Sequence, residues 1–338
     1  MTERIAEASP RLKARIAGIL YLTIIVVAAP AQAPTFRVQS SLVLVDVISQ
    51  DLKSGLPVRD FKKEDFHVSD NQHEVRIATF DAGADTRPIA LWLVVICNEG
   101  GIAGASAEFV GKESLFRSAL DHLEKHDTVG VAHWCDNGET QLDLLPTEDR
   151  DSPIHVLAES LKPIPFKGGT DDTDAVGEET FRKMIRLIIR DAYGRNPKPL
   201  PVIVFLHGDH TGQPRRELDK LVDDFLETSG IVFGIRDDRS AGLLFLIGEQ
   251  AKILHYMAKH TGGQYFSAPP SGYAAALEAV LVQLHFRYEL GFNPPAIDGK
   301  RHEIRVGLTK EAKQEHKRVR LRFRPEYIPV REEPEWAH

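Results

Sequence analysis

Polar side chains that could bind a ligand gather in three loops of this chain. The apolar run Ile89–Ile96 ends in the loop 97–101, CNEGG, and the run 202–206 ends in the loop 207–210, HGDH. A third polar loop, 166–174, leads into a predicted helix. Parallel α/β sheets bind ligands outside the carboxyl ends of their strands, where such loops meet. We therefore predict one partner-binding face, made by Asn98, Glu99, Thr170, Asp171, Asp209 and His210.

Two kinds of catalytic chemistry compete with this interpretation. Imidazole suits zinc, and His133, His207 and His210 could converge with Asp209 above the sheet, but the helical His-Glu-x-x-His pattern is absent from the sequence. The segment 204–208, VFLHG, is similar to the oxyanion loop of α/β-hydrolases, yet the chain has no Gly-x-Ser-x-Gly nucleophile elbow. The sequence therefore predicts no catalytic residue.

The two cysteines of the chain each close a predicted strand. Cys97 follows the run Ile89–Ile96, and Cys135 follows the run 128–134. If these strands are parallel neighbours, their ends lie near the ~5.5 Å Cα separation that a disulfide prefers. Two interpretations stay open, a disulfide and a pair of small buried thiols.

The first residues have the order of a secretory signal. Lys13 and Arg15 precede the apolar run 16–29, and small residues follow at 30–33. The run is shorter than the ~18 residues expected of a membrane-spanning helix. We predict a signal peptide over residues 1–31, a secreted or periplasmic location and no membrane span after cleavage; retention as an anchor stays open. The formal net charge of −7 disfavours nucleic acid and anionic membrane as partners.

The predicted elements change from β to α/β and back to β along the chain. Residues 36–80 form short strands, and residues 88–285 alternate between strand and helix. This alternation predicts an α/β fold with a doubly wound, mostly parallel six-stranded sheet that includes one antiparallel hairpin. Residues 286–323 return to alternating strands. Because neither β segment can close a core alone, we expect both to pair in one β-sandwich into which the α/β domain is inserted.

Two finer expectations concern single side chains. The predicted helix 108–125 has its apolar stripe at Phe109, Leu115, Phe116, Leu120 and Leu123. Near the end of the chain the alternation of Arg320, Arg322 and Arg324 predicts a solvated strand face.

Seven short motifs occur in a fixed order along the mature chain. They are LVLVDV (42–47), DF (65–66), Pro88 before the first core strand, GGTDDTDA (168–175), TGGQYF (261–266), YELGF (288–292) and RPEY (324–327). Together they make residues 36–330 resemble the von Willebrand factor A-related exported proteins of the acidobacterial type. The resemblance implies a signal peptide (1–31), an N-terminal β segment (34–85), a von Willebrand A-like domain (86–285), a C-terminal β segment (286–330) that pairs with the first, and a tail (331–338).

The resemblance also implies a metal-ion-dependent adhesion site. In the family, a first loop Asp-x-Ser-x-Ser, a second-loop Thr and a third-loop Asp hold Mg²⁺ through oxygen atoms. Here Thr170 matches the second loop, but Ile96 or Cys97 stands at the first aspartate, and the third loop must shift to use Asp209. We therefore expect a degenerate site and no cofactor. The candidate ligands are Glu99, Thr170 and Asp209, and the alternative ions are Mg²⁺ or Ca²⁺.

Two functional hypotheses follow from these observations. The favoured hypothesis is an exported, non-enzymatic, protein-binding or adhesion-like module with a degenerate metal site and a protein partner. The alternative is a metal-dependent adhesion protein, or with less support a metal-dependent hydrolase, that uses the same face.

Overall fold

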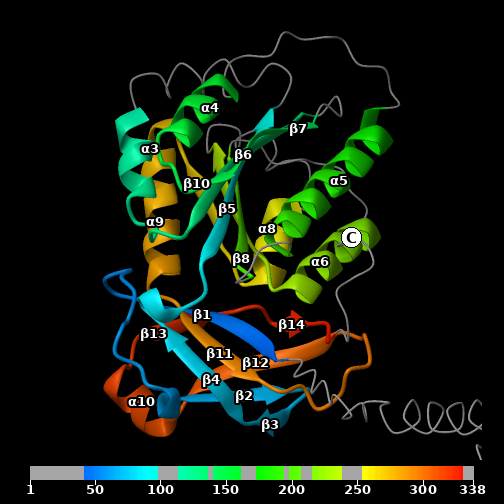
Figure 1. Cartoon of the computed structure of the whole chain (residues 1–338). Coiled ribbons are helices and arrows are strands. Elements are labelled where there is room, and N and C mark those ends of the chain that lie inside the picture. Colours follow the sequence, from blue (N-terminus) through cyan, green and yellow to red (C-terminus); the bar gives the residue numbers. More distant parts are fainter. Residues whose placement is uncertain are drawn as a thin grey trace, which may run out of the picture. The chain divides into compact units, whose positions relative to one another are not determined.

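A six-stranded sheet forms the centre of the α/β part of the chain (Figure 1). The computed structural model describes residues 42–97, 113–135, 140–160, 173–193, 198–206, 215–237 and 253–329. The strands lie in the order β10-β9-β8-β5-β6-β7, and all are parallel to their neighbours except β7, which is antiparallel to β6. This order confirms the predicted six-stranded, mostly parallel sheet. Its members are β5 (Ile89–Cys97), β6 (Thr128–Cys135), β7 (Thr140–Thr147), β8 (Leu200–Leu206), β9 (Ile231–Asp237) and β10 (Tyr265–Ala268).

Strand β5 is buried on both faces, as its uninterrupted apolar run predicts. Leu91 and Leu93 belong to the core on one side of the sheet, while Trp92 and Val94 belong to the core on the other. All four are 0% exposed. A strand between two parallel neighbours, with helices over both faces, has no position left for a polar residue.

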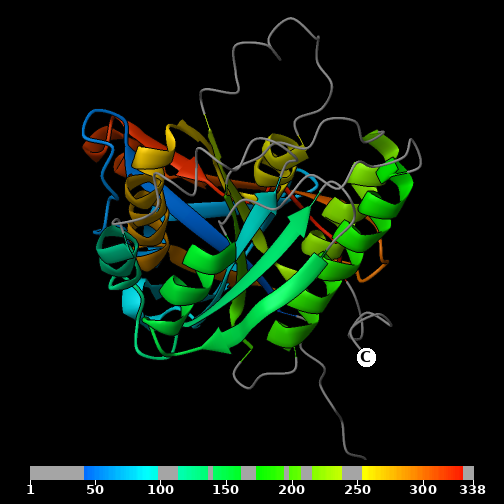
Figure 2. The ribbon, with the colours of Figure 1, turned by 90° about the horizontal axis from the view of Figure 1, so that it is seen from above.

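The helices cover the two faces of the sheet in two groups (Figure 2). One core is shared with α3, α4 and α9, and the other with α5, α6 and α8. No helix among the described residues has the length and apolar character needed to cross a membrane. The helices are α3 (Glu113–Leu120), α4 (Ser152–Ser160), α5 (Thr173–Tyr193), α6 (Arg215–Thr228), α8 (Ile253–Thr261) and α9 (Tyr273–His285).

The expectation that Leu115 of α3 lies in the core is wrong. Leu115 is 52% exposed, whereas Phe116 and Leu120 are buried. The buried stripe of α3 runs through Phe116, Ala119 and Leu120, and Leu115 lies about 100° around the helix from that stripe.

The TGGQYF motif has a structural explanation. The hydroxyl of Thr261 accepts a hydrogen bond from the Val232 amide at 3.0 Å and donates one to the Met257 carbonyl at 2.8 Å. Gly262 has a φ of +84°, which favours glycine. A β-carbon at Gly263 would lie 1.8 Å from the Val232 carbonyl oxygen, so only glycine allows α8 and β9 to approach this closely.

Two four-stranded antiparallel sheets pack around a separate core. Their orders are β13-β1-β11-β4 and β14-β12-β2-β3, so each sheet combines strands from before and after the α/β part. The members are β1 (Val43–Asp51), β2 (Phe66–Asp70), β3 (His73–Val75), β4 (Ile77–Ala82), β11 (Tyr288–Phe292), β12 (His302–Leu308), β13 (Val319–Arg322) and β14 (Glu326–Tyr327). Short helices accompany them: η1 (Lys63–Asp65), η2 (Gly83–Asp85) and α10 (Lys310–Glu315), with η4 (Pro270–Gly272) before α9.

Tyr288 lies at the centre of this sandwich core. Its ring contacts Phe61, Phe66 and Phe80 with centroid separations of 5.8, 5.3 and 5.9 Å. Its hydroxyl donates to the Val58 carbonyl at 2.9 Å and accepts from the Phe61 amide at 3.2 Å. Burial of the hydroxyl raises the pKa of Tyr288 to about 12.

The arginines near the end of the chain do not form a solvated strand face. Of Arg320, Arg322 and Arg324, only Arg320 is exposed. Arg322 donates to the side chains of Gln264 and Gln283, and burial, with a smaller effect of the charge on Arg320, lowers the pKa of Arg322 to about 10. Arg324 is 5% exposed and donates to the carbonyls of Leu226 and Leu44. The prediction is wrong for Arg322 and Arg324 because these side chains join the sandwich to the α/β part.

Candidate functional site

The carboxyl ends of β5 and β6 lie together at one edge of the six-stranded sheet. The two strands pair in parallel from Ala90 opposite Thr128 to Cys97 opposite Cys135. On the other side, β8 pairs with β5 up to Leu206, which lies opposite Val95. The two cysteines therefore end neighbouring parallel strands, which meets the condition stated for the disulfide interpretation; the choice between a disulfide and two thiols stays open.

The residues predicted for the partner-binding face lie outside the described residues. They are Asn98, Glu99, Thr170, Asp171, Asp209 and His210. The predicted zinc ligand His207 also lies outside them. Within the part of the chain that the structure describes, no group of three or more His, Cys, Asp or Glu side chains could hold a metal ion. The described residues at this edge therefore supply no set of three such ligands.

His133 is the predicted zinc ligand that the structure does describe. Its Nδ1 lies 2.9 Å from Oδ2 of Asp143 on β7, and the Ser160 hydroxyl donates to the same oxygen at 3.0 Å. The His133 and Asp143 side chains are 13% and 11% exposed. Because the carboxylate lies between the imidazole and the hydroxyl, Ser160 is not positioned as a nucleophile activated by His133. The cluster ties β6 to β7 and to the end of α4.

Asp143 and Ser160 were not identified from the sequence. The signal was weak, since an aspartate in an edge strand is normally a solvated residue. Only the pairing of β6 with β7 brings Asp143 to His133.

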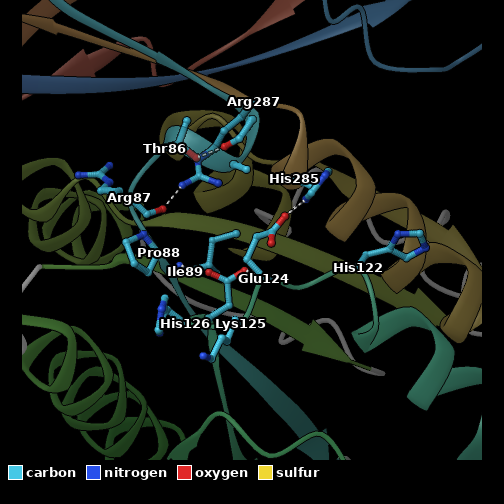
Figure 3. Close-up of a pocket in the computed structure, with 13 residues that line it drawn as sticks. Thr86, Arg87, Pro88, Ile89, His122, Glu124, Lys125, His126, His285 and Arg287 are labelled. Atoms are coloured by element: carbon cyan, nitrogen blue, oxygen red, sulfur yellow. Dashed lines mark hydrogen bonds and ion pairs between the residues drawn. The ribbon is translucent and has the colours of Figure 1, made fainter.

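A second polar site lies at the opposite edge, where β5 and β6 begin (Figure 3). A cavity of about 170 Å³ is lined by residues of the segments 83–89 and 122–127, with His285 and Arg287. Figure 3 shows Glu124 extending toward His285, and Glu124 Oε1 lies 3.0 Å from His285 Nδ1. Asp127 accepts from the Ile89 amide at 2.6 Å and the Glu124 amide at 2.8 Å. Burial raises the pKa of Asp127, although these two amides oppose the shift. Its carboxylate therefore fixes the start of β5.

Two residues that line this cavity, Arg87 and Arg287, form an ion cluster with Asp46 and Glu289. Asp46 on β1 lies 2.6 Å from an Arg87 nitrogen and 2.9 Å from Arg287 Nε, and Glu289 lies 2.9 Å from Arg87 Nε. Arg287 also donates to the carbonyls of Leu284 and Arg87. Arg87 and Arg287 stand where the chain enters and leaves the α/β part, and both bind Asp46.

The pKa values of the two carboxyls are shifted in opposite directions. Burial raises the pKa of Asp46, but the two guanidinium groups outweigh it and hold the pKa below 3.8. Burial raises the pKa of Glu289 above 4.5, and Arg87 only partly opposes that rise. The network is a structural ion cluster at the junction of the two parts.

Two charged residues inside apolar segments of the sequence indicate this cluster. Asp46 interrupts the apolar strand LVLVDV, and Arg287 separates an apolar helix from an apolar strand. Charged residues inside apolar patterns are buried only when paired, so each predicted a partner.

Comparison with known proteins gave no family for this chain. No family model and no curated protein matches the sequence. Among solved structures, the chain is similar to the conserved hypothetical protein BatB from Bacteroides thetaiotaomicron (15% identity, 58% of this chain and 97% of that chain covered, TM-score 0.36). It is also similar to a von Willebrand factor type A protein from Catenulispora acidiphila (10% identity, 79% and 74% covered, TM-score 0.40). A third similar structure is a mutant of the PilB minor pilin from Streptococcus sanguinis (9% identity, 59% and 62% covered, TM-score 0.39). TM-scores this low describe a remote likeness and carry no functional argument.

Proposed function

We propose that this chain is an exported, adhesion-like protein-binding module with a degenerate metal site and no catalytic activity of its own. Its partner is a protein, which contacts the edge of the six-stranded sheet where β5, β6 and β8 end. The contact residues are those of the loops that follow or face these ends: Asn98, Glu99, Thr170, Asp171, Asp209 and His210.

One observation carries this proposal. The parallel registers of β5 with β6 and β8 bring three strand ends to one edge, and in the sequence a polar stretch directly follows β5 and β8. Loops at the carboxyl edge of such a sheet are supported by a rigid scaffold, so they can present side chains to a partner. The described groups at this edge are engaged within the chain, since His133 binds Asp143 and Asp143 binds Ser160. That arrangement supports recognition by shape and hydrogen bonds more than it supports catalysis.

Site-specific photocrosslinking tests the partner-binding face. A benzophenone amino acid at position 99 or 209 of the full chain, expressed in its native host, is expected to cross-link the same protein. The matched control is position 305 on β12, where Arg305 is 65% exposed and far along the chain from the proposed face. Equal cross-linking from position 305, or none from 99 and 209, would overturn the proposed face.

Calorimetry tests the degenerate metal site. Mg²⁺, Mn²⁺, Ca²⁺ and Zn²⁺ are titrated separately into the chelator-treated protein. We expect no binding heat below about millimolar concentration, the weak end of oxygen-ligated sites. Tight binding of Mg²⁺ or Ca²⁺ that is lost on Glu99→Gln or Thr170→Ala would instead support the metal-dependent alternative.

The mass of the exported protein tests the signal peptide. The protein recovered from the periplasm or culture medium is expected to begin at Gln32, after removal of residues 1–31. A membrane-bound product of full-length mass would show that the segment is kept as an anchor.

A further inference from the structure

We propose that the turn after β1 inserts into the surface of an anionic lipid bilayer. This turn, residues 51–57, lies on the side of the sandwich that carries β13 and α10 (Figure 1). Two leucines of the turn, Leu52 and Leu56, would enter the bilayer interface, and basic residues beside them would meet the lipid phosphates. The surface is separate from the edge of the six-stranded sheet, so this inference does not depend on the proposed function.

The two leucines form an exposed apolar patch. Leu52 and Leu56 are 54% and 61% exposed. Single exposed apolar side chains are common on protein surfaces, whereas neighbouring ones mark interaction sites. Five large apolar side chains are exposed in the part of the chain that the structure describes, and two of them belong to this one turn. The turn is therefore the place where exposed apolar side chains concentrate.

Hydrogen bonds hold the turn in the shape that exposes these leucines. The Asp51 amide donates to the Leu56 carbonyl, and the Gly55 amide donates to the Asp51 carbonyl, both at 2.9 Å. The Asp51 carboxylate accepts from the amides of Lys53 and Ser54 at 2.9 and 2.7 Å. Gly55 has a φ of +73°, which favours glycine. Because the turn is already ordered, insertion costs little conformational entropy.

Four basic residues flank the leucines. Lys53 lies in the turn, while Lys317, Arg318 and Arg320 lie where β13 begins. The Leu52 amide donates to the Arg318 carbonyl at 2.7 Å, so the two segments lie side by side. All four basic residues are exposed. Exposed leucines beside lysine and arginine are the combination found in segments that lie in a bilayer interface.

The charge of this surface is opposite in sign to that of the whole chain. The net charge of −7 is a property of all 338 residues, whereas the segments 51–56 and 317–320 contain four Lys or Arg and one acid, Asp51. The amides of the turn already occupy an oxygen of that carboxylate. Each Lys or Arg near an anionic bilayer strengthens binding about fivefold. A local attraction to anionic lipid is therefore compatible with an acidic protein.

The shape of the surface favours a bilayer over an acidic peptide. Peptides are usually bound in grooves or along sheet edges. Leu52 and Leu56 instead stand in an exposed turn, where a peptide would cover only part of each side chain. A bilayer interface can surround both leucines and present phosphates to the flanking cations at the same time.

Co-sedimentation of the exported protein with vesicles tests the inference. We expect binding to mixed phosphatidylglycerol and phosphatidylcholine vesicles to be at least about tenfold tighter than binding to phosphatidylcholine alone, and to weaken as salt is added. The phosphatidylcholine vesicles also report any binding through the apolar run 16–29. Equal binding to both kinds of vesicle, or binding to neither, would overturn the inference.

Variants assign the binding to the turn. Leu52→Ser with Leu56→Ser should weaken binding to the mixed vesicles by about tenfold or more, and Lys53→Gln with Arg318→Gln by about 25-fold. The matched control is Leu145→Ser, because Leu145 on β7 is 65% exposed and lies outside the turn. All variants should keep the wild-type melting temperature, since the changed residues are exposed. An equal loss of binding in the Leu145→Ser control would contradict the assignment.

A tryptophan in the turn reports insertion directly. With Leu56→Trp, we expect the added emission to shift to shorter wavelength on the mixed vesicles and to be quenched by lipids with brominated acyl chains. Leu145→Trp should show neither effect. A soluble glutamate peptide that binds the wild type and the Leu52→Ser, Leu56→Ser variant equally, with no quenching of Leu56→Trp on vesicles, would show that the basic residues recognise acidic peptides and would overturn the lipid assignment. Neither result bears on the partner face at the edge of the six-stranded sheet.

Discussion

Removal of the Asp46 carboxylate is the most demanding test of the junction between the two parts of the chain. Asp46 accepts from Arg87 at 2.6 Å and from Arg287 at 2.9 Å, and the Asp46 and Arg287 side chains are 3% and 2% exposed. In Asp46→Asn, Arg87 keeps Glu289, but Arg287 is left as a buried cation with no carboxylate of its own. Breaking a buried ion pair from one side costs about 3–5 kcal/mol, mostly because the remaining charge stays desolvated.

The expected loss is measurable by equilibrium unfolding. Urea titration and calorimetry at neutral pH should show the free energy of unfolding lower by about 3–5 kcal/mol in Asp46→Asn. At about 2–4 °C per kcal/mol, the melting temperature should fall by about 6–20 °C. The matched control is Glu303→Gln, because Glu303 binds Arg305 in an exposed pair with side chains 43% and 65% exposed. That control should lose no more than about 1 kcal/mol.

A double variant distinguishes an unpaired charge from general damage to β1. Asp46→Leu with Arg287→Met removes both charges, and a buried pair replaced by apolar residues of similar size is often tolerated. The double variant should therefore be more stable than Asp46→Asn. If Asp46→Asn loses less than about 1 kcal/mol, or no more than Glu303→Gln, the charges at the junction do not have the role assigned to them here.

Three further outcomes are expected. Changing Glu99, Thr170 and Asp209 together to alanine should leave the melting temperature within about 2 °C of wild type by differential scanning fluorimetry, because surface loops contribute little to the core; a larger fall would assign them a structural role. Gly263→Ala should lower the free energy of unfolding in urea by more than about 2 kcal/mol, because its β-carbon would meet a β9 carbonyl at 1.8 Å; an unchanged urea midpoint would refute that contact. Burial raises the pKa of Tyr288 to about 12, so the protonated hydroxyl contributes to the free energy of unfolding. This contribution is complete below pH 10 and is lost as the pH rises through about 12. Urea midpoints should accordingly fall between about pH 10 and about pH 12, and the fall should be smaller in Tyr288→Phe.

Local patterns predicted the elements well because they depend on neighbours in the chain. The run Ile89–Ile96 predicted a core strand, and β5 spans Ile89–Cys97. The prediction that Leu115 is buried was wrong. Two adjacent apolar residues cannot both lie at the centre of a helical stripe, and only the packing of α3 selects Phe116.

The candidate site was only partly predictable. The sequence identified Cys97, Cys135 and His133 as residues at strand ends, and it named the polar loops beyond them. It did not identify Asp143 as the partner of His133, nor the binding of Arg322 and Arg324 across the junction. Alternation places a residue on a face, but it does not tell whether that face meets water or another part of the chain.

The strand Ile89–Cys97 was determined by sequence alone, because burial on two faces requires an unbroken apolar run. The tertiary structure decided which residues meet. Asp46 and Arg287 are separated by 241 positions, and Cys97 pairs with Cys135 only through the register of β5 and β6. Such contacts follow from the packing of whole sheets, in which a slip of one residue changes every partner, so no local pattern encodes them.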